Sequence, residues 1–196
     1  GDMVPYDHKV KTTVEDTVFS LPVNLHTINQ VYGTSMSPTE AHQFITGTEA
    51  IDLGHEPENF EEQALAMVGR RLYELFFEGY TRKQWGVSPT SLPASILKRL
   101  PLRFNYEDSY FNHPHQAIPA EGYTPIVEAI LDHEAIQVTL KTALTPASAS
   151  DYDHVIWSGP LDAYFDYDLG RLRYRTLDFE EFVTDGDFQG TPVMNY

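Results

Sequence analysis

One stretch of this sequence combines residue types that can bind a nucleotide. Residues 76–85 run Phe-Phe-Glu-Gly-Tyr-Thr-Arg-Lys-Gln-Trp, and residues 98–103 run Lys-Arg-Leu-Pro-Leu-Arg. Flat aromatic rings can stack on a base or a sugar, and an arginine can hold a diphosphate through two parallel hydrogen bonds. The alternative is that aromatic residues such as Phe76 and Trp85 belong to a hydrophobic core. The residue types alone leave both interpretations open.

Charge is unevenly distributed along the chain. Its 196 residues contain 13 Lys and Arg against 29 Asp and Glu, which gives a formal net charge of −16. Residues 70–103 nevertheless hold seven of the 13 cations and only two glutamates. A positive segment of this kind can attract a small anion, whereas the acidic chain as a whole is a poor match for nucleic acid or an anionic membrane. Solvated helix faces are the alternative explanation for these cations.

Several kinds of chemistry have no sequence signature here. Cysteine is absent, which excludes disulfides and cysteine nucleophiles, and the only close histidine pair, His113 and His115, is separated by a proline. We therefore predict no metal site. Neither a Walker loop nor Gly-x-Gly-x-x-Gly occurs, so no nucleotide-phosphate loop is expected. Paired carboxylates for glycoside hydrolysis stay open among the 29 acidic residues. The lack of a signal peptide or a long apolar run predicts a soluble, cytoplasmic protein.

The first half of the chain has strand periodicity and then helix periodicity. Alternating residues over 10–21 predict a hairpin, with its turn at Glu15-Asp16. Residues 24–100 have helical spacing and N-terminal caps at Ser37 and Asn59, which favours a bundle of four helices. Gly79 is predicted to end one of these helices.

Beyond residue 101 the spacing is mainly that of strands, with one helix predicted over 126–131. The predicted strands cover residues 102–106, 110–118, 135–140, 154–157, 171–177 and 187–194. Together with the first half, they predict an α+β fold in which a helical bundle lies on one side of an antiparallel sheet, with a partial β-α-β arrangement.

Six segments resemble the bacterial UDP-galactopyranose mutase family, in the family's order and across nearly the whole chain. They are residues 79–85 (Gly-Tyr-Thr-Arg-Lys-Gln-Trp), 98–101, 105–111, 159–166 (Gly-Pro-Leu-Asp-Ala-Tyr-Phe-Asp), 175–179 and 188–196. The resemblance implies interconversion of UDP-galactopyranose and UDP-galactofuranose by reduced FAD. In this family the reaction runs through a flavin N5–sugar adduct without net redox change, and the product serves cell-surface polysaccharide.

The resemblance also implies that this chain is the middle of a longer enzyme. The family's glycine-rich FAD loop would precede residue 1, and a further substrate- and flavin-binding portion would follow residue 196. On this basis we expect the isolated chain to be inactive and not to bind FAD, and its parent to be a homodimer. The implied divisions are sheet strands in 1–23, a substrate-binding helical bundle in 24–100, sheet strands in 101–123, a stub of the FAD-binding domain in 124–159, and sheet strands in 160–196.

Ten residues receive roles from the resemblance, and Arg99 among them is the catalytic candidate, as the mobile-loop arginine that closes on the diphosphate. The implied contacts are Phe76, Tyr80 and Thr81 with uridine, Trp85 with the galactose ring, Arg99 and Tyr110 with the diphosphate, Asn195 with sugar or phosphate, Gln30 with the uracil edge, and Val138 and Gly159 with FAD. The alternative for Arg99 is a surface charge at the C-terminus of its helix.

Two other function classes remain open from sequence. One is a non-catalytic module that binds a UDP-sugar, and the other is an oligomerisation domain built on the helical bundle. Titration with UDP distinguishes them, because an oligomerisation domain would bind no UDP.

Overall fold

The structure is a computed structural model that describes residues 2–99 and 102–196, without the side chains of Lys98 and Arg99. It contains helices and small sheets, which confirms the α+β class. The chain divides into two compact units. We call residues 3–118 with 179–196 the main unit. Residues 119–178, which interrupt it in sequence, form the inserted unit together with residue 2.

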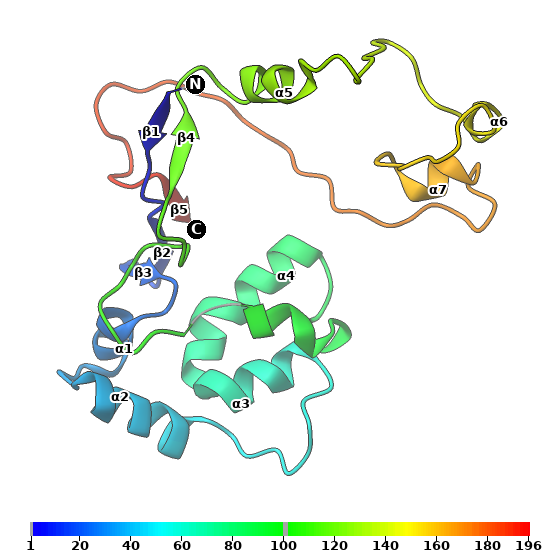
Figure 1. The fold of residues 1–196 in the computed structure, drawn as a ribbon. Coiled ribbons are helices and arrows are strands. Elements are labelled where there is room, and N and C mark those ends of the chain that lie inside the picture. Colours follow the sequence, from blue (N-terminus) through cyan, green and yellow to red (C-terminus); the bar gives the residue numbers. More distant parts are fainter. Residues whose placement is uncertain (1, 100–101) are drawn as a thin grey trace. The chain divides into compact units, whose positions relative to one another are not determined.

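A three-stranded sheet forms one part of the main unit (Figure 1). Strand β2 (Val10–Val14) pairs antiparallel with β3 (Thr17–Leu21), and their turn residues Glu15 and Asp16 both have positive φ. This backbone matches the twist of a tight hairpin and confirms the predicted one. On its other edge β2 pairs in parallel with β5 (Val193–Asn195), so the sheet is mixed rather than antiparallel. Strands β1 (Met3–Pro5) and β4 (Ala117–Pro119) form a separate two-stranded sheet.

Helices occupy most of residues 25–99, as the sequence predicts. They are α1 (Leu25–Tyr32), α2 (Pro38–Phe44), the π-helix η1 (Ile45–Glu49), α3 (Phe60–Leu72), the π-helix η2 (Tyr73–Glu78), α4 (Gly79–Trp85), and the 3₁₀ helices η3 (Pro89–Ser91) and η4 (Ala94–Arg99). The capping box at Ser37 and the Asn59 cap are both present. Gly79 does not end a helix as predicted. It is helical, and Gly86, with φ 66°, ends α4 instead.

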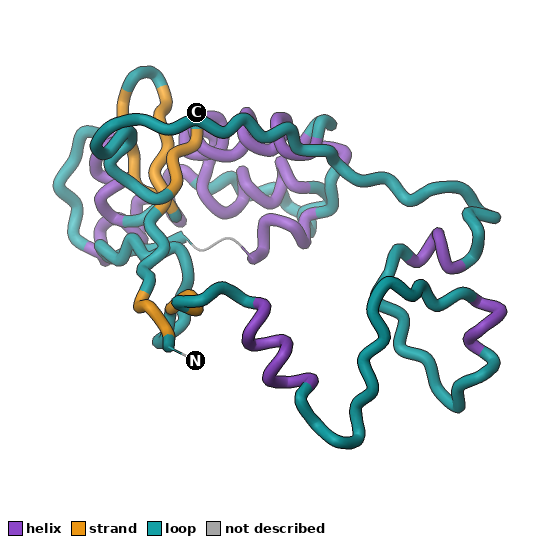
Figure 2. Tube along the Cα trace, turned by 90° about the horizontal axis from the view of Figure 1, so that it is seen from above, coloured by secondary structure: helices purple, strands orange, loops and turns teal. Residues whose placement is uncertain are grey.

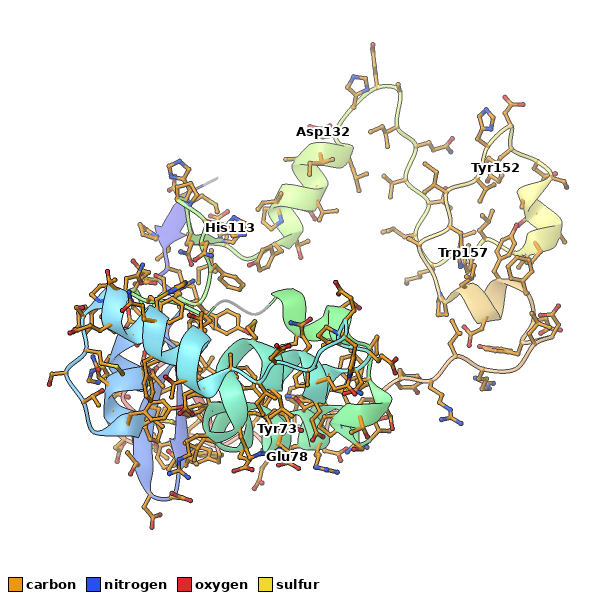
Figure 3. All side chains as sticks on the ribbon, turned by 90° about the horizontal axis from the view of Figure 1, so that it is seen from below. Tyr73, Glu78, His113, Asp132, Tyr152 and Trp157 are labelled. Carbon is orange, nitrogen blue, oxygen red and sulfur yellow. The ribbon has the colours of Figure 1, made fainter. Side chains whose placement is uncertain are left out.

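The core of the main unit lies among α1, η1, α3 and η2. Tyr73, labelled in Figure 3, is one of its largest buried side chains. Phe19 of the hairpin joins this core, because its ring meets that of Phe76 edge-on, with 5.1 Å between centroids. This aromatic contact fixes the hairpin against the end of η2. The predicted candidate site therefore lies beside a well-packed core.

Helix α3 is kinked at Gly69. This residue has φ 77° and ψ 174°, which is outside the helical region, so α3 consists of two helical pieces with different directions. A Cβ atom at Gly69 would lie 2.4 Å from the Glu49 carbonyl oxygen. Only glycine fits this backbone and this close contact, and the kink directs the chain into η2 and α4.

The inserted unit contains little regular structure (Figure 2). Its helices are α5 (Thr124–Leu131), α6 (Pro146–Ala149) and α7 (Leu161–Tyr164). Trp157, labelled in Figure 3, packs against Tyr164, with 5.1 Å between ring centroids, and donates a hydrogen bond to the Pro160 carbonyl at 3.1 Å. Many large apolar side chains of this unit are exposed, including Leu140 and Ile156.

Most strands predicted after residue 101 are absent from the described residues. Segments 102–106, 135–140, 154–157 and 171–177 contain no strand, while 110–118 and 187–194 contribute only to the short β4 and β5. Apolar alternation favours extended backbone, but a strand also needs a neighbour that accepts and donates its main-chain hydrogen bonds. No described segment pairs with these four. The helix predicted over 126–131 is confirmed as α5, whereas the β-α-β stub is unconfirmed.

No helix in residues 2–99 and 102–196 is long and apolar enough to cross a membrane.

Candidate functional site

A cavity of about 260 Å³ opens in the main unit. Its wall is built from four parts of the chain: the β2–β3 hairpin with the segment that follows it, the junction of η2 and α4, Tyr110, and residues 195–196 beside β2. These parts are up to 184 residues apart in sequence (Thr12 and Tyr196) and belong to one unit. We refer to this cavity as the pocket.

Four of the predicted site residues line the pocket together. Phe76 is buried at its wall and Tyr80 is half-exposed one helical turn later, while Tyr110 and Asn195 approach from separate segments. Asn195 is placed by strand pairing, because β5 lies in register with β2 and the Thr12 hydroxyl donates to the Asn195 carbonyl at 3.3 Å. The structure thus brings together residues that are up to 119 positions apart in the sequence (Phe76 and Asn195).

Three other predicted residues whose side chains are described belong to the main unit but do not line the pocket. Thr81 is buried and Trp85 is half-exposed at the end of α4, and neither is among the described lining residues. Gln30 of α1 donates from its side-chain nitrogen to the Val18 carbonyl at 3.1 Å, so in this structure it supports the hairpin. Residue Arg99 ends η4, but its side chain lies outside the described part of the structure.

The electrostatics of the pocket suit an anion. No Asp or Glu occurs among its described lining residues, although the chain has 29 of them. Lys83 is the one Lys or Arg in that lining, and its ammonium donates to the Tyr196 carbonyl at 3.2 Å. Neighbouring Arg82 is engaged by Glu78 at 3.1 Å. A cavity whose described lining has one lysine and no Asp or Glu side chain can hold a negatively charged group.

Tyr110 retains its proton in this environment. Burial raises the pKa of its phenol above the ordinary value of 10, and nearby Tyr80 acts in the same direction. At neutral pH the phenol is therefore an uncharged hydrogen-bond donor, which is the form that can bind an anionic oxygen.

Sequence reasoning missed several lining residues. Phe77 and Lys83 stood in the nucleotide-binding stretch without an assigned role. The spacing of Phe76, Tyr80 and Lys83 (i, i+4, i+7) was an available signal, because residues at these positions share a helix face. No sequence signal placed Thr12 or Pro22 in the pocket, since their contribution depends on how the hairpin folds against α4.

The two predicted FAD-contacting residues lie in the inserted unit. The main chain of Val138 forms no hydrogen bond within the described residues, so its N–H and C=O are available to a cofactor edge. At Gly159, a Cβ would lie 2.7 Å from the Trp157 ring. In this structure the lack of a side chain at Gly159 leaves room for the Trp157 ring.

The described ranges contain no group of three or more His, Asp or Glu side chains suited to a metal ion.

Comparison with known proteins gives consistent matches. Residues 75–196 match the family model described as UDP-galactopyranose mutase, and this segment begins at the first lining residue of η2. The "Probable UDP-galactopyranose mutase" of Klebsiella pneumoniae is 56% identical to the chain. The aligned region covers the whole chain and 51% of that relative. The "dTDP-fucopyranose mutase" of Escherichia coli is 48% identical to the chain, and the aligned region covers the whole chain and 54% of that relative. The UDP-galactopyranose mutase of Mycoplasma pneumoniae is 30% identical to the chain over the aligned region. This region covers 60% of the chain and 32% of that relative. The chain spans about half the length of the first two relatives.

Proposed function

The chain belongs to the UDP-galactopyranose mutase family, and on that basis we propose that its parent protein interconverts UDP-galactopyranose and UDP-galactofuranose. In this proposal the main unit supplies the pocket for the nucleotide sugar. The isolated chain is inactive, and the parent works in the cytoplasm as a homodimer. The product supplies galactofuranose for cell-surface polysaccharide.

The pocket is the observation that carries this proposal. It offers aromatic walls from Phe76 and Tyr80, a protonated phenol from Tyr110, an ammonium from Lys83 and no described carboxylate. A UDP-sugar combines a flat uracil ring, a diphosphate dianion and hydroxyl groups. Stacking on aromatic rings, charge-assisted hydrogen bonds and neutral donors are the interactions that such a ligand requires.

Roles follow for the individual residues. Tyr80 stacks on the uracil and Phe76 closes the apolar wall behind it, while the Tyr110 hydroxyl donates to a diphosphate oxygen. Asn195 contacts the sugar or phosphate from the sheet. Arg99 closes on the diphosphate.

Three other proposed contacts require a helix or a side chain to move when the ligand binds. Thr81 and Trp85 reach the nucleotide and the galactose only if α4 adjusts when ligand binds, and Gln30 must leave its bond to Val18 to meet the uracil edge. Such adjustment on ligand binding is common where a pocket is completed by helix ends and loops.

Reduced FAD, when bound, supplies the nucleophilic chemistry of the reaction, in which no net electron transfer occurs. Val138, whose main chain forms no hydrogen bond within the described residues, and Gly159, whose backbone lies against the Trp157 ring, would contact the cofactor. The residues of the main unit act on the substrate: they bind the nucleotide, orient the sugar and exclude water.

Calorimetric titration with UDP tests the proposal in the intact parent protein. We expect binding that weakens by roughly tenfold when Tyr80→Ala removes the stacking surface, which corresponds to a contact of about 1.4 kcal/mol. Tyr174→Ala is the matched control, because Tyr174 is an exposed tyrosine of the inserted unit. Absence of UDP binding to the wild type, or equal losses in both variants, would reject the site.

A second substrate is favoured by one specific observation. A relative that is 48% identical over the whole chain is named dTDP-fucopyranose mutase, and thymine differs from uracil by a single methyl group. Turnover assays with UDP-galactopyranose and dTDP-fucopyranose side by side decide between them. Binding of either nucleotide sugar without turnover by the intact parent would instead favour the non-catalytic module.

A further inference from the structure

We propose that Arg103 is a positioning residue that holds Tyr110 at the pocket, by tying the loop 107–112 to the segment that forms the pocket wall. The inference rests on the proposed function, because Tyr110, the residue that Arg103 holds in place, belongs to the proposed substrate site.

Arg103 is a buried cation whose partners are all uncharged oxygens. Its side chain is only 7% exposed. One terminal nitrogen, Nη1, donates to the carbonyl of Glu107 at 3.2 Å and to that of Ser109. The other, Nη2, donates to the side-chain oxygen of Asn112 and lies 3.5 Å from the carbonyl of Tyr110. No carboxylate lies within salt-bridge distance of it among the described residues.

The loop is therefore folded around the guanidinium. A buried charge is costly unless hydrogen bonds compensate for its lost hydration, and four oxygen atoms from the loop supply that compensation. The planar fork of arginine can serve several acceptors in fixed directions. Lysine has only one nitrogen, so it cannot reach the same set of oxygens at once.

The main chain of Arg103 is fixed to the pocket wall. Its N–H donates to the carbonyl of Val23 at 3.0 Å, and Val23 lines the pocket. At the other end of the connection, the Tyr110 N–H donates to the His8 carbonyl at 2.8 Å and its ring meets His8 edge-on. Arg103 thus links the wall at Val23 to the loop that carries the Tyr110 hydroxyl.

Loss of the fork should release the loop and displace the Tyr110 phenol, while the rest of the pocket remains. Tyr110→Phe removes only the hydroxyl from a loop that stays in place. If Arg103 acts through Tyr110, the two changes affect the same interaction, and their effects on UDP binding will not add.

The test uses the intact parent protein labelled with 3-fluorotyrosine, in which the Tyr110 signal is identified by its loss in Tyr110→Phe. In Arg103→Lys we expect the Tyr110 signal to shift or broaden and UDP affinity to fall roughly tenfold, in line with the loss of one charge-assisted contact. The double variant should bind UDP no more weakly than Tyr110→Phe alone. Asn112→Ala, which removes one acceptor and keeps the buried cation, should give a smaller change in the same direction and serves if Arg103→Lys does not fold.

Val68→Ala is the matched control for general loss of stability, because Val68 is fully buried in α3 and forms no part of the pocket lining. It should lower the melting temperature and leave the Tyr110 signal in place. An unchanged Tyr110 signal in Arg103→Lys, the same shift in Val68→Ala, or additive losses in the double variant would each overturn the positioning role. A wild type that does not bind UDP, together with a shifted Tyr110 signal in Arg103→Lys, would reject the proposed function and leave the positioning role standing.

Discussion

Lys83 carries the positive charge of the pocket, and its effect on affinity can be isolated. It is exposed at the rim and forms no ion pair within the described residues, so its removal should disturb the fold little. We expect Lys83→Met to weaken UDP binding roughly three- to tenfold at low salt, and less at high salt, because screening reduces the contribution of an exposed charge. Lys141→Met, at an exposed position of the inserted unit, is the control. Equal affinity of Lys83→Met and wild type at low salt would remove Lys83 from the site.

Arg99 is the residue whose function depends most on the diphosphate. We expect Arg99→Ala to reduce turnover of the parent at least roughly tenfold with little change in melting temperature, since one charge-assisted hydrogen bond contributes about 1.5–3 kcal/mol and a helix-end arginine adds little stability. Arg99→Lys should recover only part of the activity, because the ammonium keeps the charge but loses the planar fork. Wild-type turnover in the alanine variant would support the alternative of a surface charge at the helix end.

Among the elements, α3 depends on glycine at its kink. The backbone at Gly69 lies in a region that other residues enter at a cost on the order of 1–3 kcal/mol, and a Cβ would also clash with the Glu49 carbonyl. We therefore expect Gly69→Ala to lower the free energy of unfolding, measured by urea denaturation, by about 1–3 kcal/mol or more. It should also weaken UDP binding, because η2 and α4 follow the kink.

Gly47→Ala provides the opposite expectation. Gly47 lies inside η1, and a Cβ atom added there would have no neighbour within 4 Å. Alanine is favoured over glycine in a helix by roughly 0.5–1 kcal/mol, so this variant should be as stable as wild type or slightly more stable. A destabilisation equal to that of Gly69→Ala would contradict the assignment of the kink.

The capping box of α2 should make stability depend on acidity. The Ser37 main-chain N–H, which donates to the Glu40 carboxylate at 2.8 Å, lowers the pKa of that carboxyl from 4.5, and the Ser37 hydroxyl adds to the effect. A carboxyl with a lowered pKa in the folded state contributes stability that is present above pH 4.5 and lost as the pH falls through the folded value. The urea midpoint of the wild type should thus fall more between about pH 6 and about pH 3 than that of Glu40→Gln. Glu56→Gln, at an exposed loop position, should fall as wild type does, and an identical fall in all three proteins would count against the cap.

At the scale of the whole molecule, the two units should differ in protection from hydrogen exchange. Amides of α1 and α3 are covered by the buried core of the main unit, whereas 135–140 and 154–157 have neither strand partners nor buried side chains. We expect slow exchange in α1 and α3 and fast exchange in both other segments of the isolated chain. Slow exchange there would show that these segments are paired after all.

The same measurement on the intact parent tests the predicted FAD-domain stub. If the stub is real, partner strands elsewhere in the parent will pair with 135–140 and 154–157, and their amides will become protected. Residues of the β2–β3 hairpin serve as an internal standard, because they are already paired in this chain. Fast exchange of both segments in the parent would reject the stub.

Local rules in the sequence determined several elements of both units. The hairpin, the caps at Ser37 and Asn59 and helix α5 could be predicted because each depends on neighbouring residues. Gly79 was misassigned because a glycine ends a helix only where the backbone turns left-handed, and here that occurs at Gly86. The motifs also sufficed to identify the family, which depends on the order of residues and not on their positions in space.

Tertiary structure alone decided which of these residues meet. Asn195 reaches the pocket through parallel pairing with β2, and Thr12 and Val23 enter its wall through the folding of the hairpin. In sequence, Arg103 stood in the nucleotide-binding stretch as one of its cations, yet its burial and its four oxygen partners distinguish it from the exposed arginines. A strand partner can also lie far away in the sequence, as β5 does from β2, and segment 135–140 has no partner among the described residues. Periodicity records a preference of each segment, but pairing and burial are properties of two segments at once, and only the folded chain brings those together.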